Sequence, residues 1–81
     1  MELDRIKADD SLDTQGLTCP MPLLKTKKAI AKLQLGQILE VVGTDPGSKN
    51  DLPGWCERSG HSFLGVVEGS GGVLKFYIKK G

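Results

Sequence analysis

The motif Cys-Pro-Met-Pro at positions 19–22 constrains the fold more than any other feature of this chain. Proline lacks a backbone N–H and is tolerated in a helix only in the first turn, where N–H groups have no partner within the helix. We therefore predict a helix that begins at about Pro20, has Cys19 as its N-cap residue, and runs to about Leu33. Pro20 and Pro22 would stiffen the start of this helix and hold the Cys19 thiol in a fixed place.

The predicted helix has an apolar face and a basic face. At about 100° per residue, one stripe holds four residues suited to a core, which are Leu23, Thr26, Ile30 and Leu33. The opposite side holds three lysines, which are Lys25, Lys28 and Lys32. Solvation alone accounts for such a face in most amphipathic helices. Contact with an anionic partner surface is the alternative interpretation for Lys25 and Lys28. Basic side chains near a thiol would also lower its pKa.

The rest of the chain alternates between strand and helix patterns. We predict strands at residues 11–16, 37–44, 62–69 and 73–80, and a second helix at residues 48–59. The order is then βαβαββ. Two helices packed on one face of a four-stranded mixed sheet form an α/β two-layer sandwich.

Local signals mark the ends of the second helix and the faces of the last strand. Ser48 and Asp51 resemble a capping box at the start of the helix, and Gly60 suits its C-terminal end. In the last strand, successive residues alternate between the two faces. Leu74, Phe76 and Ile78 lie on one face, and Lys75, Tyr77 and Lys79 lie on the other. This pattern predicts a strand with one buried face and one solvent-exposed face.

Length and charge limit the class of protein. A chain of 81 residues predicts one small domain, which we assign to residues 11–81 after a flexible polar leader at 1–10. The net charge is +1, so no strong field favours nucleic acid or an anionic membrane. No apolar run is long enough for a membrane span, and the N-terminus lacks the apolar core of a signal peptide. We expect a cytoplasmic monomer.

Cys19 is the candidate reactive residue. In a reducing compartment the two cysteines, Cys19 and Cys56, are expected as free thiols. Cys19 precedes a helix, whose positive dipole end stabilises a thiolate, whereas a buried cysteine acting as a small hydrophobe is the plain alternative. A hydrolase would need a base near Cys19, and the sequence does not give its distance from the only histidine, His61. A presented thiolate without a base suits a carrier that takes up sulfane sulfur as a persulfide.

Other chemistries fit the cysteines less well. The residues after Cys19 do not form a Cys-x-x-Cys redox motif, and two cysteines with one histidine lack the number and spacing of zinc ligands. We predict no metal and no cofactor. Cys56 and Trp55 are expected in the core. A Cys19–Cys56 thiol–disulfide pair stays open as an alternative, and would require their Cβ atoms to lie within about 4.5 Å. A regulatory RNA- or protein-binding module is the other alternative, although only 5% of residues are aromatic.

Several segments together resemble the TusA family, also called SirA-like or YhhP-like. They are "LDTQGLTCPMPLLKTKKAI" at 12–30, "GQILEVVGTDPGS" at 36–48 and "NDLPGWCERSGH" at 50–61. The resemblance covers about residues 11–80 and includes the family's Cys-Pro-x-Pro core. Cys-Pro-x-Pro alone is a weak pattern, but these segments occur in order and at family-like spacing.

The resemblance implies a fold and a role. The fold is the same βαβαββ sandwich, similar to the C-terminal domain of a translation initiation factor. Cys19 is implied to carry a persulfide or a thiosulfate adduct. The sulfur donor is implied to be a cysteine desulfurase or a rhodanese-type sulfurtransferase, and the acceptor a DsrE-like protein. Such relays feed tRNA thiolation, molybdenum-cofactor synthesis or sulfur oxidation, and the residues do not choose among these pathways.

Overall fold

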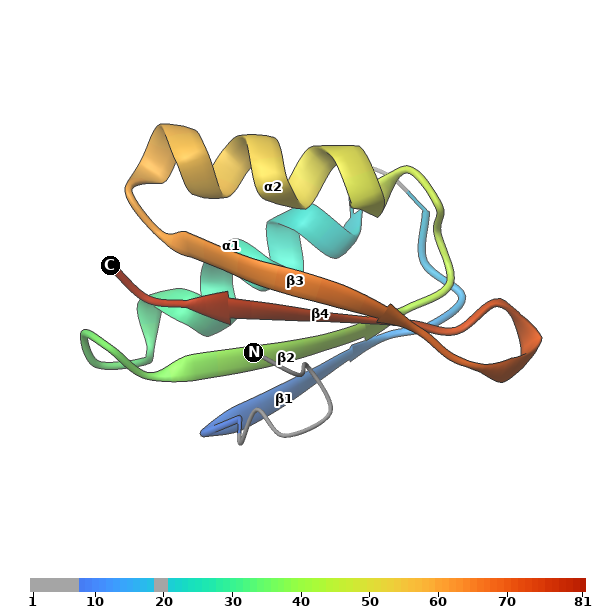
Figure 1. Ribbon diagram of the computed structural model, residues 1–81, viewed down its shortest axis with the longest axis horizontal. Helices are drawn as coiled ribbons and strands as arrows, with labels where there is room; N and C mark the ends of the chain where they lie inside the picture. The colour runs from blue at the N-terminus through green and yellow to red at the C-terminus, as the bar shows by residue number, and fades with distance from the viewer. Residues whose placement is uncertain (1–7, 19–20) are drawn as a thin grey trace.

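The computed structural model describes residues 8–18 and 21–81. Along the chain the elements are β1 (Asp10–Thr14), α1 (Met21–Ala31), β2 (Ile38–Gly43), α2 (Ser48–Ser59), β3 (Ser62–Glu68), the 3₁₀ turn η2 (Ser70–Gly72) and β4 (Leu74–Lys79). The strands form one sheet in the order β1-β2-β4-β3, and both helices lie on the same face of it (Figure 1). The predicted two-layer α/β sandwich is confirmed.

The sheet is mixed because β4 lies antiparallel between β2 and β3, while the strands that the two helices connect are parallel to each other. β1 and β2 are parallel neighbours, so the chain must cross back between them, and α1 makes this crossing. β4 pairs antiparallel with β2 on one side and with β3 on the other. One row across the sheet joins Leu12, Val41, Phe76 and Val66, all of which face the helices or pack against the core. The core is therefore built from all four strands.

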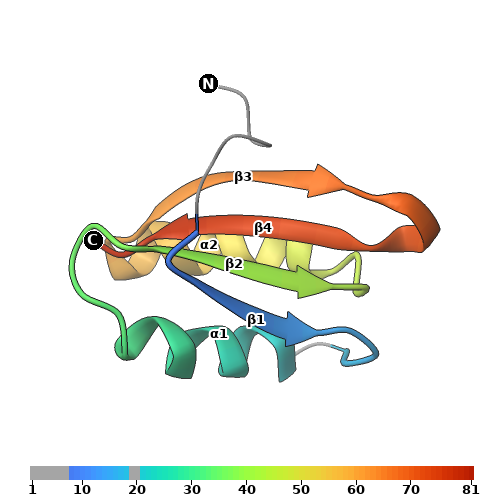
Figure 2. The ribbon, with the colours of Figure 1, turned by 90° about the horizontal axis from the view of Figure 1, so that it is seen from below.

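The core lies between the sheet and the two helices (Figure 2). Its buried members are Ile30, Leu39, Val41, Leu52, Trp55, Cys56, Leu74, Phe76 and Ile78. On α1, Thr26 and Ile30 are buried and Leu23 packs against the core, while Lys25 and Lys28 are exposed. The predicted apolar and basic faces of this helix are thus confirmed.

α1 is described from Met21, and it ends at Ala31, two residues before the predicted end at Leu33. The predicted start at Pro20 and the N-cap residue Cys19 lie outside the described residues. At the other end the last turn tightens, because the Leu33 N–H donates to the Ile30 carbonyl, at 3.1 Å. The Lys80 Nζ then donates to the Leu33 carbonyl oxygen, at 2.6 Å, which places a cation at the negative end of the helix.

α2 has the predicted bounds but not the predicted cap. Gly60 ends the helix with φ +80°, as expected of a C-terminal glycine. The capping box is wrong, because the N-cap residue is Gly47, whose N–H donates to the Asp45 carboxylate at 3.1 Å. The turn before the helix already has hydrogen bonds of the helical type, with the Ser48 N–H donating to the Asp45 carbonyl at 3.1 Å. Ser48 therefore lies inside the first turn, where it is buried.

The strands differ from the predicted ranges by at most two residues at each end. The main departure is on β4, where Lys75 and Lys79 are exposed as predicted but Tyr77 is only 5% exposed. The Tyr77 hydroxyl donates to Glu40 Oε2 on the neighbouring β2, at 2.9 Å. β4 is an inner strand, so a large side chain on the face away from the helices has neighbouring strands on both sides. The residue of β3 that pairs with Tyr77 is the small Gly65.

Ile78 provides a measure of how tightly this core is packed. Its side chain is 0% exposed, so Ile78→Val removes one buried methyl group and should lower the free energy of unfolding by about 1 kcal/mol. Urea unfolding followed by the fluorescence of Trp55 measures the change. Lys79→Ala on the same strand is the control and should change the free energy by less than about 0.5 kcal/mol. Equal effects of the two substitutions would show that β4 is not packed as described.

Candidate functional site

One edge of the sheet collects the segments around the predicted reactive residue. β1 and β2 are parallel, so their C-terminal ends meet at this edge. The loop at 15–18 follows β1, and α1 is described from Met21 onward. The start of α2 and the β3–β4 connection lie at the same edge, on the right of Figure 1. Cys19 and Pro20 lie outside the described residues, and their neighbours Thr18 and Met21 are described.

The loop at 15–18 is held to β2 by side-chain hydrogen bonds. The buried Thr14 hydroxyl donates to the Val42 carbonyl oxygen, at 2.9 Å, and the Gly16 N–H donates to Thr44 Oγ1, at 3.0 Å. Gly43 permits this contact, because a Cβ at that position would lie 2.7 Å from Thr14 Oγ1. These residues fix the path of the chain toward residue 19. Sequence reasoning missed them, and the only signal was a threonine at the end of each parallel strand.

The chain is also tied on the far side of residues 19 and 20. The Met21 N–H donates to the Thr18 carbonyl oxygen, at 2.9 Å, which draws the two described neighbours together. Pro22, predicted to support the site, is buried in the first turn of α1. The Thr26 hydroxyl is also buried and donates to the Pro22 carbonyl oxygen, at 2.7 Å. The start of α1 is therefore anchored in the core.

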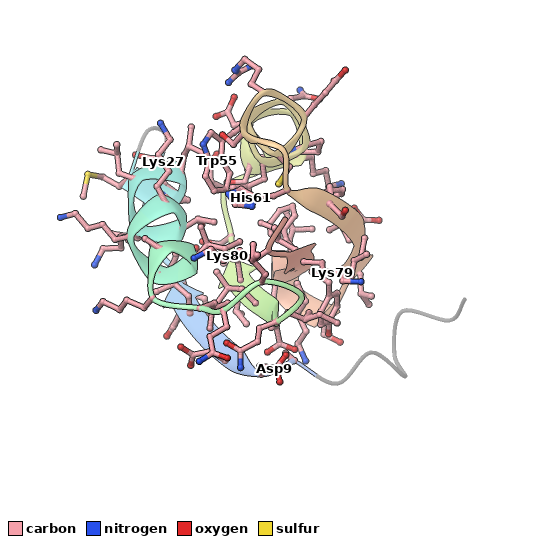
Figure 3. All side chains as sticks on the ribbon, turned by 90° about the vertical axis from the view of Figure 1, so that its left-hand side faces the viewer. Asp9, Lys27, Trp55, His61, Lys79 and Lys80 are labelled. Atoms are coloured by element: carbon pink, nitrogen blue, oxygen red, sulfur yellow. The ribbon has the colours of Figure 1, made fainter. Side chains whose placement is uncertain are left out.

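The outer face of α1 is basic and partly apolar. Lys25 and Lys28 are exposed, and α1 contains no acidic residue. Met21 and Leu24 are each 43% exposed, which is unusual for large apolar side chains in such a small domain. Figure 3 labels Lys27 on α1 and shows Lys79 on the other side of the molecule. The exposed Met21 and Leu24 were not predicted, because helix periodicity identifies the buried stripe and not the exposed exceptions.

Cys56 has a different environment. It is 1% exposed within the core, as predicted, and burial raises the pKa of its thiol from 9.0 to about 11. Such a thiol stays protonated at neutral pH and is a poor nucleophile. Trp55, on the same helix, is buried as predicted, and its ring centroid lies 5.1 Å from that of His61.

His61 lies at the opposite edge of the sheet from the loop at 15–18. It precedes β3, which runs parallel to β2 because both are antiparallel to β4. The start of β3 and the end of β2 are thus separated by the length of a strand, about 20 Å for six residues. His61, which is labelled in Figure 3, instead accepts a hydrogen bond at Nδ1 from the Gly81 N–H, at 3.1 Å. His61 therefore lies about one strand length from the sheet edge where the loop at 15–18 is held.

A metal site and a membrane-spanning helix are two features that the described part of the chain does not contain. Within residues 8–18 and 21–81, no group of three or more His, Cys, Asp or Glu side chains is arranged to hold a metal ion. Over the same residues, no helix has the length and apolar character needed to cross a membrane.

Comparison with known proteins identifies the family. The family model described as "Sulfurtransferase TusA" matches residues 10–80. The chain belongs to the TusA family. YrkI of Bacillus subtilis is 51% identical over 76 residues, which cover 94% of this chain and 100% of YrkI. The sulfur carrier protein TusA of Allochromatium vinosum is 40% identical over 72 residues, which cover 89% of this chain and 93% of that protein.

Solved structures agree with the TusA assignment. The crystal structure of the SirA-like protein from Desulfitobacterium hafniense matches with a TM-score of 0.79 at 29% identity, covering 89% of this chain and 97% of that chain. Some relatives are longer, and this chain spans 40% and 39% of two of them. The TusA domain therefore occurs both as a short chain and as part of larger proteins.

The buried thiol of Cys56 predicts a specific pH dependence of stability. In the unfolded chain this thiol loses its proton near pH 9, whereas in the folded domain its pKa is about 11. Between these values the unfolded chain releases the proton first, so the free energy of unfolding should fall as pH rises from 9 to 11. Urea unfolding of the wild type and of Cys56→Ala at several pH values isolates this contribution. If both proteins show the same slope above pH 9, Cys56 is not buried as a neutral thiol.

Proposed function

We propose that this protein is a cytoplasmic sulfur carrier that accepts a sulfane sulfur on Cys19 and hands it to an acceptor protein. The observation that supports this most is the fixed path of the chain on both sides of residue 19. Thr18 is the last residue of a loop that is hydrogen-bonded to Thr44 at the end of β2, and Met21 opens a helix anchored by Pro22 and Thr26. Membership of a family of sulfur carriers supports the same role.

Electrostatics favour a thiolate at this position. α1 has eleven residues, long enough for its aligned peptide dipoles to place partial positive charge at its start. A thiol attached there has a lowered pKa, since the charged form is stabilised. The exposed Lys25 and Lys28, one and two turns into the helix, add positive potential on the same side. Cys19 is therefore the nucleophile that we assign, with Pro20 and Pro22 setting the start of the helix.

The proposed sulfur transfer needs no external oxidant. The Cys19 thiolate attacks the terminal sulfur of the donor persulfide, Cys–S–SH. A new S–S bond forms on Cys19 as the donor's S–S bond breaks, so the donor leaves as a thiolate and Cys19 becomes a persulfide. Transfer to the acceptor repeats the same exchange. A carrier needs no general base for this step, which agrees with the place of His61 at the other edge of the sheet.

The two alternative functions have less support. A Cys19–Cys56 redox pair needs two reactive thiols, and Cys56 is buried with a raised pKa. An RNA-binding module needs aromatic side chains on which bases stack. The aromatic residues here are Trp55, Phe63, Phe76 and Tyr77, of which three are buried and Phe63 is packed against the core. None of them is exposed as a stacking surface.

The outer face of α1 is the docking surface that we propose for sulfur-relay partners. It combines Lys25 and Lys28 with the exposed apolar side chains of Met21 and Leu24, which are neighbours at a spacing of three residues. An acidic partner surface with an apolar centre would complement it. A cysteine desulfurase or rhodanese-type sulfurtransferase as donor, and a DsrE-like protein as acceptor, are the partners that we propose for a monomeric carrier.

Intact-mass spectrometry without reductant tests the function. After incubation with a cysteine desulfurase and cysteine, the wild type and Cys56→Ala should each gain the mass of one sulfur, and Cys19→Ser should gain none. Incubation with tetrathionate should likewise leave a thiosulfate adduct, Cys–S–S–SO₃⁻, on Cys19 with thiosulfate as the leaving group. Loading of Cys19→Ser, or no loading of the wild type by either reagent, would refute the carrier role.

Charge reversal on α1 tests the docking surface. Lys28→Glu should slow sulfur transfer from the donor about fivefold or more at low salt, since one unit charge near a partner charge contributes about 1 kcal/mol in water. The difference should shrink at 1 M salt, where the screening length is about 3 Å. Lys79→Glu, on the other side of the molecule (Figure 3), is the matched control and should transfer at the wild-type rate. Unchanged transfer by Lys28→Glu at low salt would remove Lys28 from the docking surface.

A further inference from the structure

A small cavity opens at the same edge of the sheet as the loop at 15–18. Its volume is about 220 Å³, and it lies between the start of α2 and the β3–β4 connection. Its lining residues are Thr44, Pro46, Lys49, Glu68, Gly72 and Leu74. We refer to this cavity as the edge pocket. Neither the transfer chemistry nor the outer face of α1 accounts for it.

The edge pocket is suited to an uncharged group. Leu74 is 5% exposed and belongs to the core, and Pro46 and Gly72 add no charge. The only charged lining groups are Lys49 and Glu68, and they form an ion pair with each other. Because their charges are paired, an anionic or cationic ligand would have to compete with an existing partner. An apolar occupant would leave the ion pair between Lys49 and Glu68 intact.

The size of the edge pocket excludes a large ligand. Sites for cofactors and drug-sized molecules measure about 300–1,000 Å³, whereas this cavity measures about 220 Å³. An aliphatic or aromatic side chain of another protein is a better match. Such side chains act as anchors at protein interfaces when they enter a pocket near the centre of the contact.

One residue links the edge pocket to the proposed carrier site. Thr44 lines the pocket, and its Oγ1 accepts the hydrogen bond from the Gly16 N–H, at 3.0 Å. Gly16 precedes residue 19 by three residues, a chain length of at most roughly 11 Å. A protein that exchanges sulfur with Cys19 must bring its own sulfur to bonding distance, so it must cover this edge of the sheet.

We propose that the edge pocket receives an apolar side chain of the protein that exchanges sulfur with Cys19. This inference rests on the carrier function and adds a second contact area to the outer face of α1. The loop at 15–18 is bonded to the pocket-lining Thr44 and leads in sequence to α1, so a partner that reaches this loop can contact both areas. Such a partner has an acidic surface that contacts α1. It also has one apolar anchor, a leucine, methionine or phenylalanine side chain, that enters the pocket.

Substitutions at the mouth of the pocket test the proposal. Glu68 is exposed at the end of β3, so Glu68→Trp places a large ring over the opening. Glu68→Gln removes the same charge but leaves the pocket open. Glu57→Trp adds the same ring to an exposed position eight residues beyond Lys49, about 12 Å further along α2. Sulfur transfer is measured from a cysteine desulfurase to each variant, and from each loaded variant to a DsrE-like protein. Tetrathionate loading of Cys19 is the reference that needs no partner.

The proposal predicts that Glu68→Trp slows transfer about tenfold or more in at least one direction, as expected for loss of an interface anchor. Tetrathionate loading should stay within about twofold of wild type, and Glu68→Gln and Glu57→Trp should transfer normally. Wild-type transfer by Glu68→Trp in both directions would overturn the proposal, and so would an equal loss in Glu68→Gln. Failure of the carrier function itself would look different, because the wild type would then load with neither reagent.

Discussion

The parallel pairing of β1 with β2 is the constraint on which the rest of the structure depends. It joins Leu12 to Val41 in the core and obliges the chain to return through α1 before β2 can form. The return begins at the sheet edge where both strands end. The bonds from Thr14 to Val42 and from Gly16 to Thr44 then hold the returning loop against β2. The loop that precedes Cys19 in the sequence is thereby held against a rigid sheet.

The buried Cys56 contrasts with the role that we propose for Cys19. Cys56 points into the core from α2, where burial raises its pKa and makes it a packing residue. Cys19 is the residue that we propose as the nucleophile, and its described neighbours Thr18 and Met21 lie at the sheet edge where α1 begins. The edge also carries exposed apolar side chains on α1 and a cavity beyond Thr44. This division favours a function in which a single thiol carries out the chemistry and the surrounding surface recognises the partner protein.

Local rules predicted the elements well and the contacts between them poorly. The prolines and the spacing of Thr26 and Ile30 identified α1, and Gly60 identified the end of α2, because these signals act within one or two turns. The capping box failed because the turn from Asp45 already forms hydrogen bonds of the helical type before Ser48. The bond between Gly16 and Thr44 spans 28 residues of sequence, so no local pattern could predict it. The edge pocket likewise combines segments that only the sheet order brings together.

Discharge of a loaded protein is the measurement that tests the central claim most directly. The wild type would be loaded by a cysteine desulfurase, separated from the donor and mixed with a DsrE-like acceptor, and the masses of both proteins would be followed over time. The account predicts that the extra sulfur leaves Cys19 and appears on the acceptor, molecule for molecule. A sulfur that stays on Cys19, or that is released as sulfide without reaching the acceptor, would contradict the account.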